Sequence, residues 1–333
     1  MTIKLTIIGL GQIGVSVGLA LDDKGELLQR VGHDRERKVA AYANKIGAVD
    51  RIENNLHKSV ENADMVVLSL PVDQIQETME LIAEDLKEDS VVMDTGAIKG
   101  AVQTWAEEIL PAKRHYVGLT PVINPAYLHV ADTGAHAARA DLFRGGLMAI
   151  VAPPRTDSAA IKLASDLTRL LGAQPLFVDP LEMDGLMAST HLLPQLVAAG
   201  LLNATIDQPV WNEGRKVAGK AYAEATAPIV HLDDAHTLGE SVMLNRENML
   251  RVLDSTIAAL YAIRSDIDEN NPEALDDRLK RARYGREKWF AEREAAEWMA
   301  EDLPAVDMSN QPSFFGRLFG AKPRKKNKFI RID

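Results

Sequence analysis

Short apolar runs alternate with amphipathic stretches through the first half of the chain. The runs cover Ile3–Ile8, Leu28–His33, Met65–Leu70, Val91–Asp94, Tyr116–Leu119 and Leu147–Val151. Between them, stretches such as Gln74–Leu86 and Ala101–Leu110 carry apolar residues at helical spacing. Strands that alternate with helices are typical of βαβ units in a mostly parallel sheet. The pattern therefore predicts a doubly wound α/β fold, to which a helix at Ser158–Leu171 and a strand at Pro175–Val178 add one more unit.

The strand signal stops at Pro180, and the second half of the chain has helical spacing throughout. The predicted helices cover Leu181–Ile206, Trp211–Ala225, Asp234–Asp268 and Pro272–Met299. In the third of them, apolar residues from Leu238 to Ile267 form a stripe of the kind that packs against other helices, in the same subunit or in a partner. We therefore expect an α/β domain over 1–180, an all-helical domain over 181–302 and a tail over 303–333.

The composition is that of a globular protein of two domains, with 333 residues, 46% hydrophobic and 26% charged. The chain has no cysteine, which excludes disulfides, thiol nucleophiles and cysteine-ligated metals and is compatible with a reducing cytoplasm. Leu5–Leu21 is mostly apolar, but four glycines interrupt it. We therefore expect neither a signal peptide nor a membrane span there.

Charge is divided unevenly between the body and the tail. The chain carries 38 Lys and Arg against 48 Asp and Glu, a net charge of −10. Ser313–Asp333 alone holds seven basic residues and one acid, together with Phe314, Phe315 and Phe319. The acidic body argues against non-specific nucleic-acid binding. The basic aromatic tail suits peripheral contact with an anionic membrane or a partner protein, or else a solvated flexible segment.

A glycine pattern follows the first apolar run. It reads Gly9-Leu10-Gly11-Gln12-Ile13-Gly14, and Asp34 lies at the end of the second run, directly after His33 and 20 residues after Gly14. In this context the first glycine permits a tight turn, the second lets a pyrophosphate approach the backbone, and the third lets helix and strand pack closely. We therefore predict a dinucleotide site. Asp34 favours NAD by accepting from the ribose 2′-OH, whereas Arg35 and Arg37 are placed to hold the 2′-phosphate of NADP.

Residues at the ends of two later runs complete this prediction, because open α/β sheets bind ligands beyond the carboxyl ends of their strands. Those expected to border the cofactor are Ser69, Leu70, Pro71, Asp94 and Thr95. Within this group we expect Asp94–Lys99 to lie nearest the reacting ring. No metal-ligand spacing is evident, and His231–His236 fits a helix start capped by Asp233 or Asp234.

These motifs together resemble the prephenate/arogenate dehydrogenase family from Ile3 to about Trp298. The resemblance rests on the glycine pattern followed by Ser16, on Asp94-Thr95-Gly96-Ala97-Ile98-Lys99, Gly118-Leu119-Thr120-Pro121, Leu170-Leu171-Gly172-Ala173, Leu193-Pro194-Gln195 and Asn245-Arg246-Glu247-Asn248. It implies a Rossmann-type domain joined to a helical dimerisation domain, hence a homodimer. It also implies NAD- or NADP-dependent oxidation of prephenate or arogenate, with loss of CO2, toward tyrosine.

Three positions depart from the family pattern where the chemistry should lie. Thr120 replaces the histidine that hydrogen-bonds the substrate hydroxyl, Ala97 replaces a serine that helps to hold it, and Gln195 replaces a second histidine. Arg246 is kept, and the matching arginine of the family binds a substrate carboxylate. A positioned general base contributes about 10²–10⁴-fold to a rate, and a threonine hydroxyl does not titrate near neutral pH.

The candidate catalytic or substrate-binding residues are Thr120, Lys99, His191, Gln195 and Arg246. His191 lies four residues before Gln195, so both would face one side of a helix. Lys99 is either a site residue or the ion-pair partner of a nearby acid. Further candidate histidines are His115, His129 and His136. Two alternative functions stay open: a dehydrogenase of the same fold for another hydroxy or imino acid, and a catalytically lapsed dinucleotide sensor or scaffold.

Overall fold

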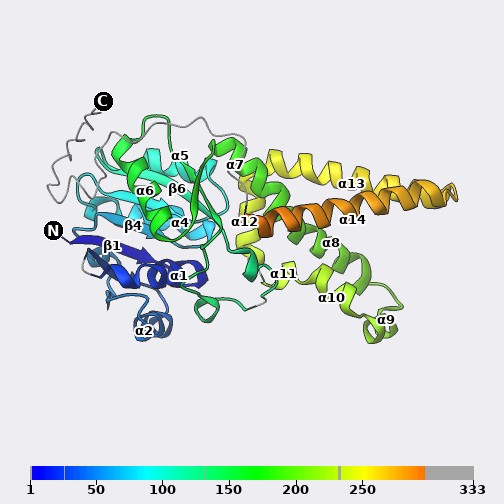
Figure 1. Ribbon diagram of the computed structural model, residues 1–333, viewed down its shortest axis with the longest axis horizontal. Helices are drawn as coiled ribbons and strands as arrows, with labels where there is room; N and C mark the ends of the chain where they lie inside the picture. The colour runs from blue at the N-terminus through cyan, green and yellow to red at the C-terminus, as the bar shows by residue number, and fades with distance from the viewer. Residues whose placement is uncertain (1, 26, 131, 232–233, 297–333) are drawn as a thin grey trace, which may run out of the picture.

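The α/β part of the computed structural model is one eight-stranded sheet. The structure describes residues 2–25, 27–130, 132–231 and 234–296. The strand order is β3-β2-β1-β4-β5-β6-β7-β8, and every neighbouring pair is parallel except β6 and β7. Helices pack on both faces of this sheet (Figure 1). The predicted doubly wound, mostly parallel fold is confirmed.

Most strands follow the predicted apolar runs. They are β1 Ile3–Ile8, β2 Leu28–His33, β3 Arg51–Ile52, β4 Met65–Leu68, β5 Val91–Asp94, β6 His115–Val122, β7 Leu147–Val151 and β8 Gln174–Phe177. The prediction is wrong for β4, which ends two residues early, and for β6, which is longer at both ends. It also missed β3, whose two residues are too few to show a periodic pattern.

Six helices accompany the strands, three on each face of the sheet. They are α1 Gln12–Ala20, α2 Arg37–Lys45, α3 Leu56–Val60, α4 Val72–Ile82, α5 Gly100–Ile109 and α6 Ser158–Leu170. Buried residues of α1, α2 and α6 form the core on one face, and those of α3, α4 and α5 form the core on the other. The second core continues into the helical part through Leu192 and Met249, so the two parts share one apolar interior.

The helical part begins directly after the sheet. Its elements are α7 Pro180–Met187, a π-helical turn at Ala188–Leu192, α8 Leu193–Ile206, α9 Trp211–Val217, α10 Lys220–Thr226, α11 Pro228–His231, α12 Ala235–Leu244, α13 Arg246–Asp268 and α14 Pro272–Ala295. The Asp179 carboxylate accepts from Leu181 N at 2.9 Å and so caps α7. In Figure 1, α13 and α14 run side by side away from the sheet, joined by an Arg278–Asp266 ion pair at 2.8 Å.

Two of the predicted helices are wrong in their continuity. The stretch Asp234–Asp268 is interrupted at Asn245, between α12 and α13, where the backbone has φ −112° and ψ 31°. The stretch Trp211–Ala225 divides before Gly219, which is extended. The Asp234 carboxylate caps α12 as predicted, accepting from His236 N at 2.9 Å and from Thr237 N at 3.2 Å. Asp233, the end of Pro272–Met299 and the tail 303–333 lie outside the described residues.

By length and composition alone, the helical run Pro180–Ile206 is apolar enough to cross a membrane, with a mean hydropathy of 1.3. Core helices of globular proteins meet the same criterion, and only 22% of this segment is buried. The earlier apolar stretch, Leu5–Leu21, contains most of β1, the glycine turn and α1.

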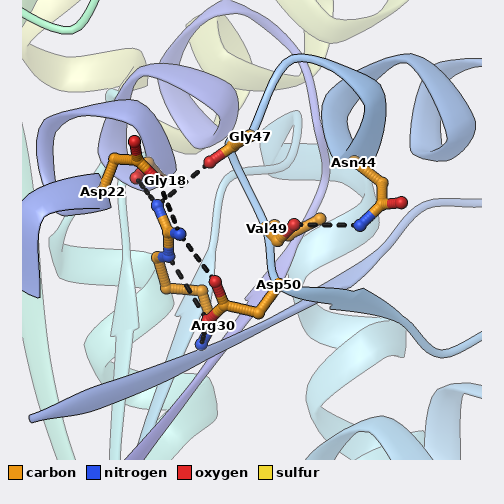
Figure 2. A network of polar contacts seen from close by, with 7 residues as sticks. All are labelled: Gly18, Asp22, Arg30, Asn44, Gly47, Val49 and Asp50. Atoms are coloured by element: carbon orange, nitrogen blue, oxygen red, sulfur yellow. Dashed lines mark hydrogen bonds and ion pairs between the residues drawn. The ribbon is translucent and has the colours of Figure 1, made fainter. Parts of the chain in front are cut away.

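A buried arginine joins three segments around β2. The Arg30 guanidinium, 4% exposed, donates to Asp22 at 2.9 Å, to Asp50 at 2.6 Å, and to the carbonyls of Gly18 and Gly47 at 2.9 and 3.1 Å (Figure 2). Burial raises the pKa of Asp50, but the hydrogen bonds from Arg30 outweigh it and hold that pKa below its ordinary value of 3.8. The network thus anchors the end of α1, whose beginning forms the glycine turn.

Candidate functional site

The glycine turn lies where the strand order reverses, since β2 lies on one side of β1 and β4 on the other. Ligands of doubly wound sheets bind beyond the carboxyl ends of the strands at this point. Gly9 turns the chain from β1 toward α1 with φ +89°, and a Cβ there would lie 2.2 Å from the Ser69 carbonyl oxygen. A Cβ on Gly14 would lie 2.0 Å from the Gly9 carbonyl oxygen. Both positions therefore require glycine.

A cavity of about 670 Å³ opens beyond these strand ends. Of the predicted cofactor residues, its lining includes Gly9, Gly11, Asp34, Arg35, Ser69, Leu70 and Pro71. A Cβ on Gly11 would meet no heavy atom within 4 Å, so the backbone here is open to a ligand. The free backbone at a helix N-terminus suits a pyrophosphate, and the carboxylate of Asp34 suits a ribose. The residues present therefore fit a dinucleotide.

Asp34 and Arg35 are held by neighbours on two sides of this cavity. The Asp34 carboxylate accepts from Leu10 N at 2.7 Å and from Glu36 N at 2.8 Å. An ionised carboxylate has about four acceptor positions, so it keeps capacity for ribose hydroxyls. Arg35 Nη2 donates to Gln74 Oε1 of α4 at 2.6 Å, and both side chains line the cavity. This contact directs the guanidinium toward α4.

Five predicted cofactor residues do not line this cavity: Gln12, Ile13, Gly14, Asp94 and Thr95. Gln12 Nε2 instead donates to the Ala137 carbonyl at 3.3 Å, and Thr95 Oγ1 donates to Ser69 Oγ at 3.4 Å. The side chain of Asp94 is fully buried beneath the strand ends, which corrects its predicted place at the cofactor. The sequence locates the strand end, but the direction of a side chain depends on the packing around it.

Asp94 is the centre of a buried polar cluster. Its Oδ2 accepts from Lys99 Nζ at 2.6 Å and from Gly96 N at 2.8 Å, and its Oδ1 accepts from the Tyr116 hydroxyl at 2.6 Å. Burial lowers the pKa of Lys99, an effect that the Asp94 charge opposes. Burial and the same charge raise the pKa of Tyr116 well above its ordinary value of 10.0. Lys99 thus forms an ion pair with Asp94 and is fully buried.

Asp184 joins this cluster from α7 of the helical part. Its carboxylate accepts from Lys99 N at 2.7 Å and Gly100 N at 3.0 Å, at the start of α5. Its backbone carbonyl accepts from Asn245 Nδ2 at 2.7 Å, and Asn248 Nδ2 donates to Asn245 Oδ1 at 2.9 Å. Burial raises the pKa of Asp184, and the two amide hydrogen bonds oppose that rise. The helical part and the nucleotide-binding edge are thereby linked.

The remaining catalytic candidates lie on both sides of this link. Thr120, 4% exposed on β6, has its Oγ1 3.5 Å from the Gly96 carbonyl. His191 is half-buried in the π-helical turn, and its carbonyl accepts from Nε2 of the buried Gln195 at 3.2 Å. Turns of this kind are frequent at functional sites. Arg246 is exposed at the first residue of α13.

The other candidate histidines lie elsewhere. His115 is the first residue of β6, at the opposite end of that strand from the cavity. The His129 ring lies 5.5 Å from that of Phe290, and the His136 ring lies 4.3 Å from that of Tyr42. Within the described ranges, no group of three or more histidine, aspartate or glutamate side chains is placed to hold a metal ion.

Sequence reasoning missed Tyr116, Asp184 and Gln74. Tyr116 appears only as an apolar member of a strand, and Gln74 only as the start of an amphipathic helix. Asp184 carries a signal that could have found it, since it is the one acid on an otherwise apolar turn, Met183–Met187. An acid in an apolar helical turn requires a partner, but the sequence does not say which.

Comparison with known proteins shows which enzymes the chain is similar to. A family model described as the nucleotide-binding domain of prephenate dehydrogenase matches residues 17–176. The prephenate dehydrogenase of Bacillus subtilis (strain 168) is 24% identical over 286 residues, covering 85% of this chain and 75% of the relative. The cyclohexadienyl dehydrogenase of Zymomonas mobilis is 23% identical, covering 85% of this chain and 94% of the relative. Residues 17–176 thus match the nucleotide-binding domain of prephenate dehydrogenases, and most of the chain is similar to dehydrogenases that act in this family.

Solved structures of this family share the fold. The prephenate dehydrogenase of A. aeolicus, in complex with hydroxyphenyl propionate and NAD+, is 22% identical with a TM-score of 0.75, covering 87% of this chain and 99% of that one. The arogenate dehydrogenase of Synechocystis is 20% identical with a TM-score of 0.68, covering 86% and 100%. The chain is an oxidoreductase of the prephenate dehydrogenase-like class, and residues 17–176, which include most of its sheet, match the nucleotide-binding domain.

Proposed function

We propose that this protein is an NAD-dependent dehydrogenase that oxidises prephenate or arogenate, with loss of CO2. The observation that carries the proposal is the cavity at the reversal of strand order, bordered by the glycine turn and Asp34. The relatives named prephenate and cyclohexadienyl dehydrogenase support the substrate class. We further propose that the chain works as two domains that meet near Pro180, where the sheet gives way to helices.

The charges around the cavity favour NAD over NADP. Carboxylates of Asp34, Glu36 and Glu77 line it, and they would repel a 2′-phosphate. The two arginines that would hold such a phosphate, Arg35 and Arg37, also line the cavity, but Arg35 is bonded to Gln74. When bound, the nicotinamide accepts the hydride that leaves the substrate.

On the substrate side we assign a separate task to each of three residues. Arg246 binds a substrate carboxylate, because its guanidinium is exposed and matches a carboxylate in geometry and charge. Thr120 donates or accepts a hydrogen bond at the substrate hydroxyl. His191, whose neutral imidazole can accept a proton, is the proposed acceptor of the proton that leaves the substrate hydroxyl. Release of CO2 to give an aromatic ring draws the reaction forward.

Cofactor titration and a turnover assay test this proposal together. Protein fluorescence should detect NADH binding more readily than NADPH binding, and prephenate or arogenate should then be oxidised. Arg246→Ala should lower kcat/KM for the acid by about 30- to 100-fold, the loss expected for one hydrogen bond between charged groups. Arg264→Ala is the control, since Arg264 lies on the same helix in an exposed ion pair with Asp268 at 3.6 Å.

Three outcomes would contradict the proposal in different ways. Binding of neither dinucleotide would remove the nucleotide site. Binding without oxidation of either acid would favour the lapsed sensor, and turnover of another hydroxy or imino acid would favour the related dehydrogenase. Equal losses in Arg246→Ala and Arg264→Ala would remove the role of Arg246.

We also propose that two copies associate through the helical part. Large apolar side chains are exposed there on α8, α13 and α14, among them Val197, Ile257, Leu260, Tyr261 and Tyr284. Light scattering should give twice the mass of one chain, and Leu260→Asp, a charge placed on a 60% exposed apolar position, should reduce that mass to one chain. A wild-type protein with the mass of a single chain would contradict this proposal.

A further inference from the structure

We propose that Asp184 is a positioning residue for the substrate: it ties Arg246, at the start of α13, to the strand-end edge of the nucleotide-binding domain. The inference rests on the proposed role of Arg246 in carboxylate binding. Asp184 is on α7 and is not one of the residues that line the cavity. Its effect on the substrate must therefore pass through a chain of contacts, which has two links.

The first link joins α7 to α5. The first amides of a helix have no acceptor within the helix, and Lys99 at the start of α5 offers no capping side chain of its own. The two oxygens of Asp184 take this place, accepting from Lys99 N at 2.7 Å and Gly100 N at 3.0 Å. The contact is close, since a Cβ on Gly100 would lie 2.8 Å from Asp184 Oδ2. Asp184 is 6% exposed, so water does not compete effectively for these bonds.

The second link joins α7 to α13. Asn245, 5% exposed, donates from its side-chain Nδ2 to the Asp184 carbonyl at 2.7 Å. Its Oδ1 accepts from Asn248 Nδ2 at 2.9 Å. Asn245 is also the residue at which α12 ends and α13 begins, with Arg246 next in the chain. The helices lie close here, as a Cβ on Gly185 would be 3.7 Å from Asn248 Oδ1. The Asn245 side chain thus fixes the backbone just before Arg246 relative to α7.

Together the links run from α5, through Asp184, to the residue before Arg246. The α5 end belongs to the cluster of Asp94 and Lys99, beneath the strand ends where Thr120 lies. A displacement of about 1 Å at a substrate-positioning group can cost on the order of 100-fold in rate. Loosening Asp184 should therefore weaken use of the substrate while leaving the cavity around Asp34 as it is.

Hydrogen exchange of the full-length protein tests the links without any need for turnover. Asp184→Asn keeps the size of the side chain but replaces one of its two acceptor oxygens by a donor. Amides at 99–104 and at 245–250 should then exchange faster than in the wild type. Asp179→Ala is the matched control, because it removes the cap of the same helix α7 without touching either link. Unchanged exchange at 245–250 in Asp184→Asn, or an equal change in Asp179→Ala, would overturn the inference.

Kinetics then separate positioning from a general loss of stability. Asp184→Asn and Asn245→Ala should each raise KM for prephenate about tenfold, while the Kd for NADH stays within about twofold of the wild type. In an Arg246→Ala background the same changes should alter KM less than about twofold, because the group that they position is gone. A full tenfold effect without Arg246 would reduce Asp184 to a structural residue. A wild type that oxidises neither acid would contradict the proposed function, whereas the exchange result would still decide the links.

Discussion

Lys99→Met is expected to lower the free energy of unfolding by about 3–5 kcal/mol at neutral pH, which is the cost of leaving one partner of a buried ion pair alone. Lys99 and Asp94 are both fully buried, with 2.6 Å between Nζ and Oδ2. Asp184 is a second carboxylate in the same cluster, bonded to the Lys99 amide. Without the ammonium group, Asp94 would lose the cation that it is paired with, and a second carboxylate, Asp184, would remain close by in the interior. Urea denaturation monitored by circular dichroism measures the loss.

Two further variants make the result specific to the buried pair. Lys113→Met breaks an ion pair with Glu88 at 3.1 Å whose side chains are 65% and 61% exposed, and it should cost less than about 1 kcal/mol. Adding Asp94→Asn to Lys99→Met should recover part of the lost stability, since the orphaned charge is removed. A Lys99→Met protein as stable as Lys113→Met would show that the cluster does not depend on its cation.

Gly9→Ala is expected to abolish measurable NADH binding and to destabilise the fold. The residue has φ +89°, and its added methyl would lie 2.2 Å from the Ser69 carbonyl oxygen and 2.8 Å from a methyl of Leu70. Neither the turn nor the neighbouring strand end can keep its place, and both border the cavity. NADH fluorescence titration and thermal unfolding, on the same preparation, report the two effects.

Gly11→Ala separates binding from stability at the same turn. A methyl here meets no heavy atom within 4 Å, so the melting temperature should stay near that of the wild type. The methyl would nevertheless stand in the cavity where the backbone is open to a pyrophosphate, and NADH affinity should fall by at least about tenfold. Wild-type affinity in Gly11→Ala would contradict the placement of the dinucleotide along this turn.

The nucleotide half of the site was predictable because its signals are local. Gly9 and Gly14 are required by contacts within one βα turn, and Asp34 follows from the length of one βαβ unit. The cavity accordingly includes most of the predicted cofactor residues. Asp94 was placed at the correct strand end but with its side chain in the wrong environment, since burial and its bonds to Lys99 and Tyr116 depend on neighbours from other segments.

The catalytic half was much less predictable. Asp184 and Asn245 are 61 residues apart in the chain, and neither belongs to a pattern of charge or spacing that pairs them. The break at Asn245 was hidden by an apolar stripe that continues through it, because a periodic pattern records which face is buried and not whether each turn is closed. The substitutions Ala97, Thr120 and Gln195 were visible, but not what surrounds them.

The sequence by itself determined the alternation of the main strands and helices of the sheet, the glycine turn and the acid that follows it, because periodicity and backbone sterics act over a few residues. Only the tertiary structure decided that Lys99 is buried against Asp94, that Arg35 is bonded to Gln74, and that Asp184 caps α5 from another part of the chain. These are pairings of polar groups across long separations. Their choice is made by burial, since a polar group removed from water must bond to whatever partner the packing brings near.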